Sequence, residues 1–321
     1  MRRFAAFFAV AGLAALEAIR RPVFLLASLS VCSGIVLLPL ALNYTLGDSA
    51  RIVRDSSLAL YLVGGILLGA HAAGDGLSRE LRRGTAAAVL SKPVSRSSFF
   101  LAKAVGVWGA LLLYSATAFA AILLAVRAGA YDLHVDRAAA VPALLAPLCA
   151  LACAGAWNHR TRRPFVSAAF FSLLAFFLAA LAVSAAFPTP LDHLPFPRNF
   201  SWNVLSVGIL LHLFLCMVSA FASALATRLD ISPLMVAAAA AFALGLAADG
   251  FLAARIDSSP PALAVYALLP NVQAFWLVDA LDASAPIPAS YFALAAAYAL
   301  AWSAAALALG AASFRTLEIA R

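Results

Sequence analysis

The stretch GDGLSRELRRGTAAAVLSKPVSRSSFFLAK, residues 74–103, is strongly basic in a chain that is otherwise apolar. It carries six Lys and Arg residues against two acidic ones, and it lies between the uncharged runs 57–73 and 104–126. Clusters of Lys and Arg between apolar runs are typical of cytoplasmic loops in membrane proteins. The stretch therefore predicts a cytoplasmic arm that joins two membrane spans.

The composition places most of the chain in lipid. Of the 321 residues, 65% are hydrophobic and only 11% are charged, and the mean hydropathy is +0.98. Soluble domains have about 25% charged residues, so the main solvent of this chain must be lipid. The net charge of +8 does not indicate nucleic-acid binding, because the basic residues form short clusters between apolar runs. We expect an all-α polytopic membrane protein with no nucleic-acid partner.

Eight apolar stretches have lengths suited to crossing a bilayer, which takes about 20 residues. They are residues 22–46, 57–73, 104–126, 138–157, 165–187, 202–226, 231–252 and 289–312. Pro22 suits the first turn of its helix, whereas Pro142 and Pro147 should make the fourth span irregular. We treat residues 1–321 as a single transmembrane domain.

The remaining segments have distinct compositions. Residues 1–21 contain thirteen apolar residues between arginines, which predicts a helix lying at the membrane interface rather than a span. Residues 253–288 are semi-polar and rich in proline, which predicts a partly re-entrant segment outside the cytoplasm. The connections 47–56 and 158–164 are expected to be loops, and residues 313–321 form a cytoplasmic tail.

The distribution of Lys and Arg predicts the orientation of the chain. With eight spans, the side that holds both termini and residues 74–103 carries 16 of these residues, against 6 on the other side. By the positive-inside rule, both termini are then cytoplasmic. Six spans are the alternative, but they would bury the basic sequence NHRTRRP of residues 158–164 or misplace a hairpin.

The spans offer few groups for chemistry. No predicted span contains an Asp or Glu near its middle, and the sequence has no GxxxxGK[ST] motif for binding nucleotide phosphates. His212 is the ionisable group near the middle of a span; it either lines a pathway or bonds a neighbouring helix. Cys149 and Cys153 share a helix face but have no further metal ligands nearby in sequence. We therefore expect no catalytic residues, no metal site and no cofactor in this chain.

The basic arm has signals for a helix–turn–helix. Residues 74–83 should extend the second span as a helix that ends at Gly84. Thr85 is placed to cap a helix over residues 86–90, and Ser91-Lys92-Pro93 should break it. Ser95 should then cap the helix that enters the third span. On charge alone, a solvated loop attracted to anionic lipid explains the arm equally well.

The order of residues in the arm resembles the signature of the ABC type-2 exporter permeases. The matching elements are Glu80, Gly84-Thr85, Leu90-Ser91-Lys92-Pro93-Val94-Ser95-Arg96 and Lys103. The resemblance implies the membrane subunit of an ATP-driven exporter in a bacterial-type inner membrane. Its implied partners are a separate nucleotide-binding subunit, which would hold ATP and Mg²⁺, and a second permease copy or a paralogue.

The resemblance also implies roles for individual residues. The arm would couple to the ATPase subunit, with Arg79, Glu80, Arg82, Arg83 and Arg96 contacting that subunit or bracing the arm. Gly84 and Pro93 would set the bends of the arm, and Thr85, Lys92 and Ser95 belong to the same coupling region. The re-entrant segment would be residues 262–281, where Asn271, Gln273 and Trp276, together with His212, are candidate pathway residues.

The number of spans departs from the family pattern, and two other functions stay open. The family usually has six spans, whereas this sequence predicts eight, with an additional hairpin at residues 138–187. The alternatives are an ATP-independent secondary transporter or channel, which the lack of carboxylates in the spans disfavours, and a membrane scaffold that recruits a cytoplasmic partner through the basic arm.

Overall fold

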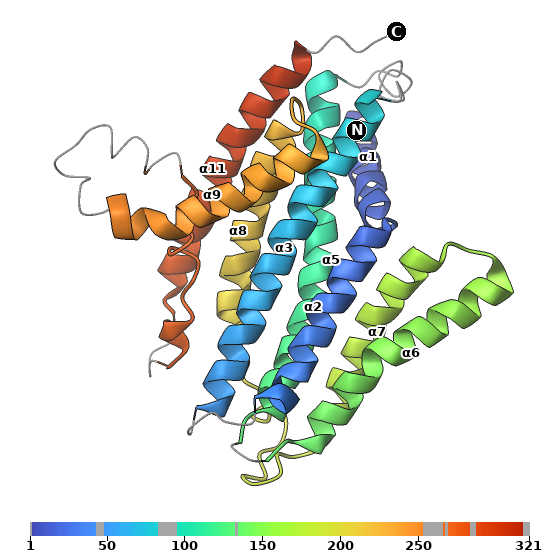
Figure 1. Ribbon diagram of the computed structural model, residues 1–321, viewed down its shortest axis with the longest axis vertical. Coiled ribbons are helices and arrows are strands. Elements are labelled where there is room, and N and C mark those ends of the chain that lie inside the picture. The colour runs from blue at the N-terminus through green and yellow to red at the C-terminus, as the bar shows by residue number, and fades with distance from the viewer. Residues whose placement is uncertain are drawn as a thin grey trace. The chain divides into compact units, whose positions relative to one another are not determined.

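The computed structural model (Figure 1) describes residues 2–42, 48–82, 95–131, 134–252, 266, 269–282 and 287–316. Side chains are described for these residues except 2–3, 77–82, 249 and 252. Regular secondary structure within the described residues is helical, apart from one isolated bridge between Tyr131 and His134. The predicted all-α fold class is therefore confirmed.

The described helices follow in chain order. They are α1 (Arg2–Ile19), α2 (Pro22–Ala41), α3 (Ser49–Arg82), α5 (Arg96–Ala128), α6 (Arg137–Thr161), α7 (Phe165–Ala185), α8 (Val204–Leu225), α9 (Ile231–Leu252), the 3₁₀-helix η2 (Asp279–Asp282) and α11 (Ala289–Arg315).

Eight of the described helices are long and apolar enough to cross a membrane: α2, α3, α5, α6, α7, α8, α9 and α11. This agrees with the predicted eight spans, and the chain is a multi-pass membrane protein. The predicted seventh span has the same bounds as α9, and Pro22 lies in the first turn of α2. Residues 2–19 form a separate helix, α1, as predicted; its position at the membrane interface stays a prediction.

The structure corrects two predicted loops. The predicted connection 47–56 is largely helical, because α3 begins at Ser49, and Arg51 Nε lies 3.8 Å from Asp55 Oδ2 across one turn. The predicted loop 158–164 is also shorter, because α6 continues to Thr161. Arg162 then ends α6 in the left-handed conformation, with φ of 58°, and donates its N–H to the Asn158 carbonyl at 2.9 Å.

Neither Pro142 nor Pro147 ends the fourth span, since α6 is one continuous helix that contains both residues. Proline at position 142 removes the N–H that would bond the Ala138 carbonyl. The Ser184 hydroxyl of α7 lies 2.8 Å from that carbonyl and 2.8 Å from the Ala180 carbonyl, so its proton is shared between the two. A side chain of the adjacent helix thus replaces the missing donor, as is common in membrane helices.

The chain divides into two compact units, which are described separately. The first unit comprises Met1–Ala18, Ile66–Leu111 and Ile209–Arg321, and the second comprises Ile19–Gly65 and Leu112–Gly208. Helices α3, α5 and α8 each contribute one part to each unit.

The second unit contains a helical hairpin, α6–α7, which contacts α2 (Figure 1). Phe24 of α2 and Phe170 of α7 meet edge to face with ring centroids 5.3 Å apart. Deeper in this unit, the Tyr114 hydroxyl donates to the Tyr61 carbonyl at 2.9 Å, and the two rings stack. These aromatic contacts and buried hydrogen bonds fix α3 against α5.

The first unit is packed around the beginning of α5. A Cβ atom at Gly106 would lie 2.5 Å from the Ala14 Cβ atom, so α1 can lie this close to α5 only because position 106 is glycine. On α5, the Trp108 indole N–H donates to the Cys216 carbonyl of α8 at 3.1 Å. The start of α5 is therefore enclosed by α1 and α8.

Candidate functional site

The structure describes the predicted coupling residues only at the two ends of the arm. Residues 79, 80 and 82 (Arg79, Glu80 and Arg82) are on the last turns of α3, which confirms that the helix of the second span extends into the arm. Arg83, Gly84, Thr85, Lys92 and Pro93 lie outside the described residues. Ser95 and Arg96 are described, at the point where the arm enters α5.

Ser95 caps α5, as the sequence predicts. The Ser98 N–H donates to the Ser95 hydroxyl at 3.2 Å, and the Phe99 N–H donates to the Ser95 carbonyl at 2.9 Å. A serine cap satisfies one of the N–H groups that the first turn of a helix leaves without a helical acceptor. The cap fixes where the arm ends and the rigid helix begins.

The first turn of α5 is bound to the last turn of α11. Arg96 Nη1 donates to the Arg315 carbonyl at 3.3 Å, and Arg315 Nε donates to the Ser97 hydroxyl at 2.7 Å. Directly below, Phe99 and Phe100 stack on Phe314, with ring centroids 6.2 and 5.9 Å apart. Arg96 therefore links the first turn of α5 to the last turn of α11; its role in coupling stays a prediction.

An ion pair that the sequence analysis missed joins α5 to α1. Lys103 Nζ lies 2.9 Å from Glu17 Oε2, with 11% and 30% of the two side chains exposed. In the sequence, the one hint of this ion pair is that each residue is a single charge at the end of an apolar run. With this pair, the first two turns of α5 are tied to α1 and α11.

Asn271 lies in a small pocket of about 310 Å³ in the first unit. Its side-chain amide donates to the Tyr266 hydroxyl at 2.7 Å, and its backbone N–H donates to the Tyr298 hydroxyl at 3.3 Å. Tyr291 also lines the pocket and donates its hydroxyl to the Ala274 carbonyl at 2.8 Å. The tyrosines around Asn271 were not predicted, and they hold this part of residues 269–282 against α11.

The other predicted pathway residues have different surroundings. Gln273 is exposed and Trp276 is half-buried. His212 lies on α8, where its Nε2 atom is 3.7 Å from the Cys216 sulfur one turn further along the same helix. The pocket around Asn271 is lined by neither Gln273 nor Trp276 nor His212, so the four residues do not form one cluster there.

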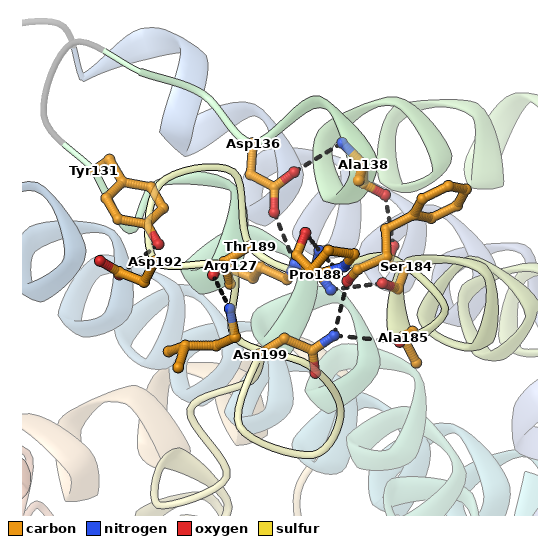
Figure 2. A network of polar contacts seen from close by, with 12 residues as sticks. Arg127, Tyr131, Asp136, Ala138, Ser184, Ala185, Pro188, Thr189, Asp192 and Asn199 are labelled. Carbon is orange, nitrogen blue, oxygen red and sulfur yellow. Dashed lines mark hydrogen bonds and ion pairs between the residues drawn. The ribbon is translucent and has the colours of Figure 1, made fainter.

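A buried arginine in the second unit is the strongest polar feature that the sequence analysis missed. Arg127 Nε lies 2.8 Å from Asp136 Oδ2, and 1% and 3% of the two side chains are exposed (Figure 2). The guanidinium also donates to the carbonyls of Ser184 and Phe187, at 2.6 and 3.0 Å. In the sequence, Arg127 and Asp136 lie between the predicted spans 104–126 and 138–157, and no local pattern indicates that they pair.

The neighbouring residues extend this network over the loop that follows α7. The Asn199 amide donates to the Ala185 and Phe187 carbonyls, and the Tyr131 hydroxyl donates to Asp192 Oδ2 at 2.7 Å (Figure 2). Partial burial, together with the Asp192 carboxylate, raises the pKa of the Tyr131 hydroxyl. The network is a structural clamp on the loop, because its donors and acceptors are largely used by backbone groups.

The described residues show no group of three or more His, Cys, Asp or Glu side chains placed to hold a metal ion. Cys149 and Cys153 carry free thiols. The polar groups described above connect helices and loops to one another. Comparisons with protein-family models, curated proteins and solved structures gave no match, so the function is argued from the residues themselves.

Proposed function

We propose that the chain is the membrane-spanning subunit of an ATP-driven exporter of the ABC type-2 kind. A separate nucleotide-binding subunit would bind and hydrolyse ATP with Mg²⁺, and a second copy of this chain or a paralogue would complete the pathway. The expected setting is a bacterial-type inner membrane, with both termini in the cytoplasm. The motif in residues 74–103 and the eight helices able to cross a membrane support this proposal.

The observation that carries the proposal is the anchoring of both ends of the arm. On one side, α3 is a single helix from its candidate span to Arg82. On the other side, α5 is capped by Ser95 and tied to α11 by Arg315 and to α1 by Lys103. Rigid elements transmit a displacement. An arm that only recruits a partner would not need this anchoring.

The anchoring gives a path for force through the first unit. A nucleotide-binding subunit that pushes on the arm would move α3 and α5 along their axes, and the bonds at Ser97 and Lys103 would carry α11 and α1 with them. The free energy comes from nucleotide binding and hydrolysis in the partner. The work of this chain is to convert that movement into opening of a pathway between helices.

The proposal is tested by purifying the tagged full-length protein from its own host in a mild detergent. Mass spectrometry then identifies co-purifying P-loop ATPases. Wild type is compared with Arg82→Glu/Arg83→Glu, and the control is Arg160→Glu/Arg163→Glu, which reverses two exposed charges around the end of α6.

We expect a P-loop ATPase with wild type and with the control, and about tenfold less of it with the arm variant, because like charges across an interface repel. Equal ATPase yields from all three proteins, or a wild-type protein that purifies without any ATPase, would contradict the proposal.

A further inference from the structure

An apolar groove of about 470 Å³ lies between the C-terminal parts of α8 and α11, both in the first unit. Apolar side chains form most of its walls, among them Phe221, Leu225, Trp302, Ala305 and Leu309. Arg228 lines one end. Of these, Leu309 is 73% exposed, so the groove is open toward the surroundings of the helix.

A close approach of the two helices forms the floor of the groove. A Cβ atom at Gly310 would lie 2.9 Å from the Ala224 Cα atom, so α11 can lie against α8 here only without a side chain at position 310. Above this contact, the Phe221 and Trp302 rings face each other with centroids 6.0 Å apart. The groove is therefore a built feature of the helix pair, with a glycine floor and aromatic walls.

The length of the groove matches the depth of one leaflet. It extends along α11 from Ser313 to Trp302, which is roughly 16 Å at the helical rise of about 1.5 Å per residue. The hydrocarbon core of a bilayer is about 30 Å thick, so each leaflet contributes about 15 Å. With the C-terminal end of α11 at the membrane surface, a groove of this length reaches about the bilayer centre.

Positive charge gathers at the surface end of the groove. Arg228 Nε donates to the Ser313 hydroxyl at 2.9 Å, and Arg228 Nη2 donates to the Thr316 hydroxyl at 3.0 Å. Arg315, one residue beyond Ser313, donates to the Ser97 hydroxyl. Both arginines are exposed, and the acceptors of these bonds are neutral hydroxyl oxygens, so the charge of neither guanidinium is balanced by them.

We propose that this groove binds one acyl chain of an anionic phospholipid, with the lipid phosphate at Arg228. An apolar channel of one-leaflet depth fits an acyl chain, whereas a transmembrane helix of a second copy would require a face about 30 Å long. Basic groups between transmembrane helices at the membrane surface bind anionic head groups. The site depends on the membrane placement of α8 and α11 and is independent of the exporter proposal.

The test uses native mass spectrometry of the purified full-length protein, titrated separately with dioleoyl phosphatidylglycerol and dioleoyl phosphatidylcholine. Ala305→Trp fills the groove, and Ala304→Trp places the same side chain at an exposed neighbouring position that does not line it. Arg228→Gln removes the charge at the mouth, and Arg160→Gln removes an exposed charge on α6. Thermal unfolding of each variant checks that it is folded.

For wild type we expect one phosphatidylglycerol bound about fivefold more tightly than phosphatidylcholine. Arg228→Gln should lose this preference, and Ala305→Trp should weaken binding of both lipids by on the order of tenfold, because the acyl chain is displaced. Ala304→Trp and Arg160→Gln should behave as wild type.

Three outcomes would overturn the proposal: equal wild-type affinity for the two lipids, Ala305→Trp binding like Ala304→Trp, and a wild-type dimer that Ala305→Trp dissociates without changing lipid binding. The last outcome would assign the groove to a second copy of the chain.

Discussion

Two ion pairs at the ends of apolar helices, Lys103–Glu17 in the first unit and Arg127–Asp136 in the second, have almost the same length, 2.9 and 2.8 Å. They differ in burial: Glu17 keeps 30% of its side chain exposed, whereas Arg127 and Asp136 keep only 1% and 3%. They differ also in their surroundings, since Arg127 has further carbonyl acceptors and lies over the Phe200 ring. The same chemistry is therefore placed in two different environments.

The difference in burial determines how strongly each ion pair holds its neighbours in place. A buried, fully bonded charge is costly to expose and therefore holds its neighbours in one arrangement. A partly exposed pair is worth less, because water replaces part of the interaction when the pair opens. We infer that the Arg127 network is a fixed clamp, whereas the Lys103–Glu17 pair at the base of the arm contributes less to the stability of the fold.

The largest effect on stability is expected in the Arg127 network. Arg127→Met should lower the free energy of unfolding by about 3 kcal/mol, because Asp136 would remain buried without its partner. The measurement is the thermal unfolding of the purified protein, with Arg137→Met, which alters an exposed neighbouring arginine, as the control.

A second variant, Arg127→Met/Asp136→Asn, removes both charges and keeps an oxygen to cap α6, where Asp136 Oδ1 accepts from the Ala138 N–H. It should recover part of the lost stability. A double variant that is no more stable than Arg127→Met would contradict the clamp, and so would an effect of Arg127→Met no larger than that of the control.

A smaller effect on stability is expected for the Lys103–Glu17 pair. In a double-mutant cycle with Lys103→Met and Glu17→Gln, the coupling energy should be about 1 kcal/mol, since the pair is partly exposed. Thermal unfolding gives the stabilities of wild type, the two single variants and the double variant, in low and in high salt. The coupling energy should fall as the salt concentration rises. A coupling of several kcal/mol would place this pair in the same class as Arg127–Asp136 and remove the distinction.

The smallest effect is expected at the Ser95 cap. Ser95→Ala should cost about 0.5 kcal/mol, at the low end for helix caps, because the capping bond is exposed and 3.2 Å long. Hydrogen exchange of the amides of residues 97–99 should become faster while the global unfolding temperature is nearly unchanged. Ser95→Asn keeps a capping oxygen and should exchange as wild type; faster exchange in both variants would show that the cap is not the cause.

Much of the fold could be predicted because it depends on local composition. The bounds of α9, the proline at the start of α2 and the serine cap of α5 follow from apolar length and from helix-end chemistry. The sequence could not show that a distant donor, the Ser184 hydroxyl, compensates for one of the two prolines in α6. A local rule contains no information about a side chain on another helix.

The polar contacts could not be predicted for the same reason. Arg127 finds its carbonyl acceptors 57 and 60 residues further along the chain, and Lys103 finds Glu17 86 residues earlier. A count of charges per loop predicts the side of the membrane but not these partners. Of the coupling region, the sequence predicted the cap at Ser95 and the helical extension to Arg82, whereas Arg83 to Pro93 lie outside the described residues.

The most direct test of the central claim, that residues 74–103 dock on an ATPase subunit, is photo-crosslinking in the native membrane. A photoreactive phenylalanine is placed at position 83 in the arm, and at position 160, an exposed site at the end of α6, as the matched control. We expect a crosslink from position 83 to a P-loop ATPase and none from position 160. ATPase crosslinks of equal yield from both positions, or crosslinks from position 83 only to lipid or unrelated proteins, would contradict it.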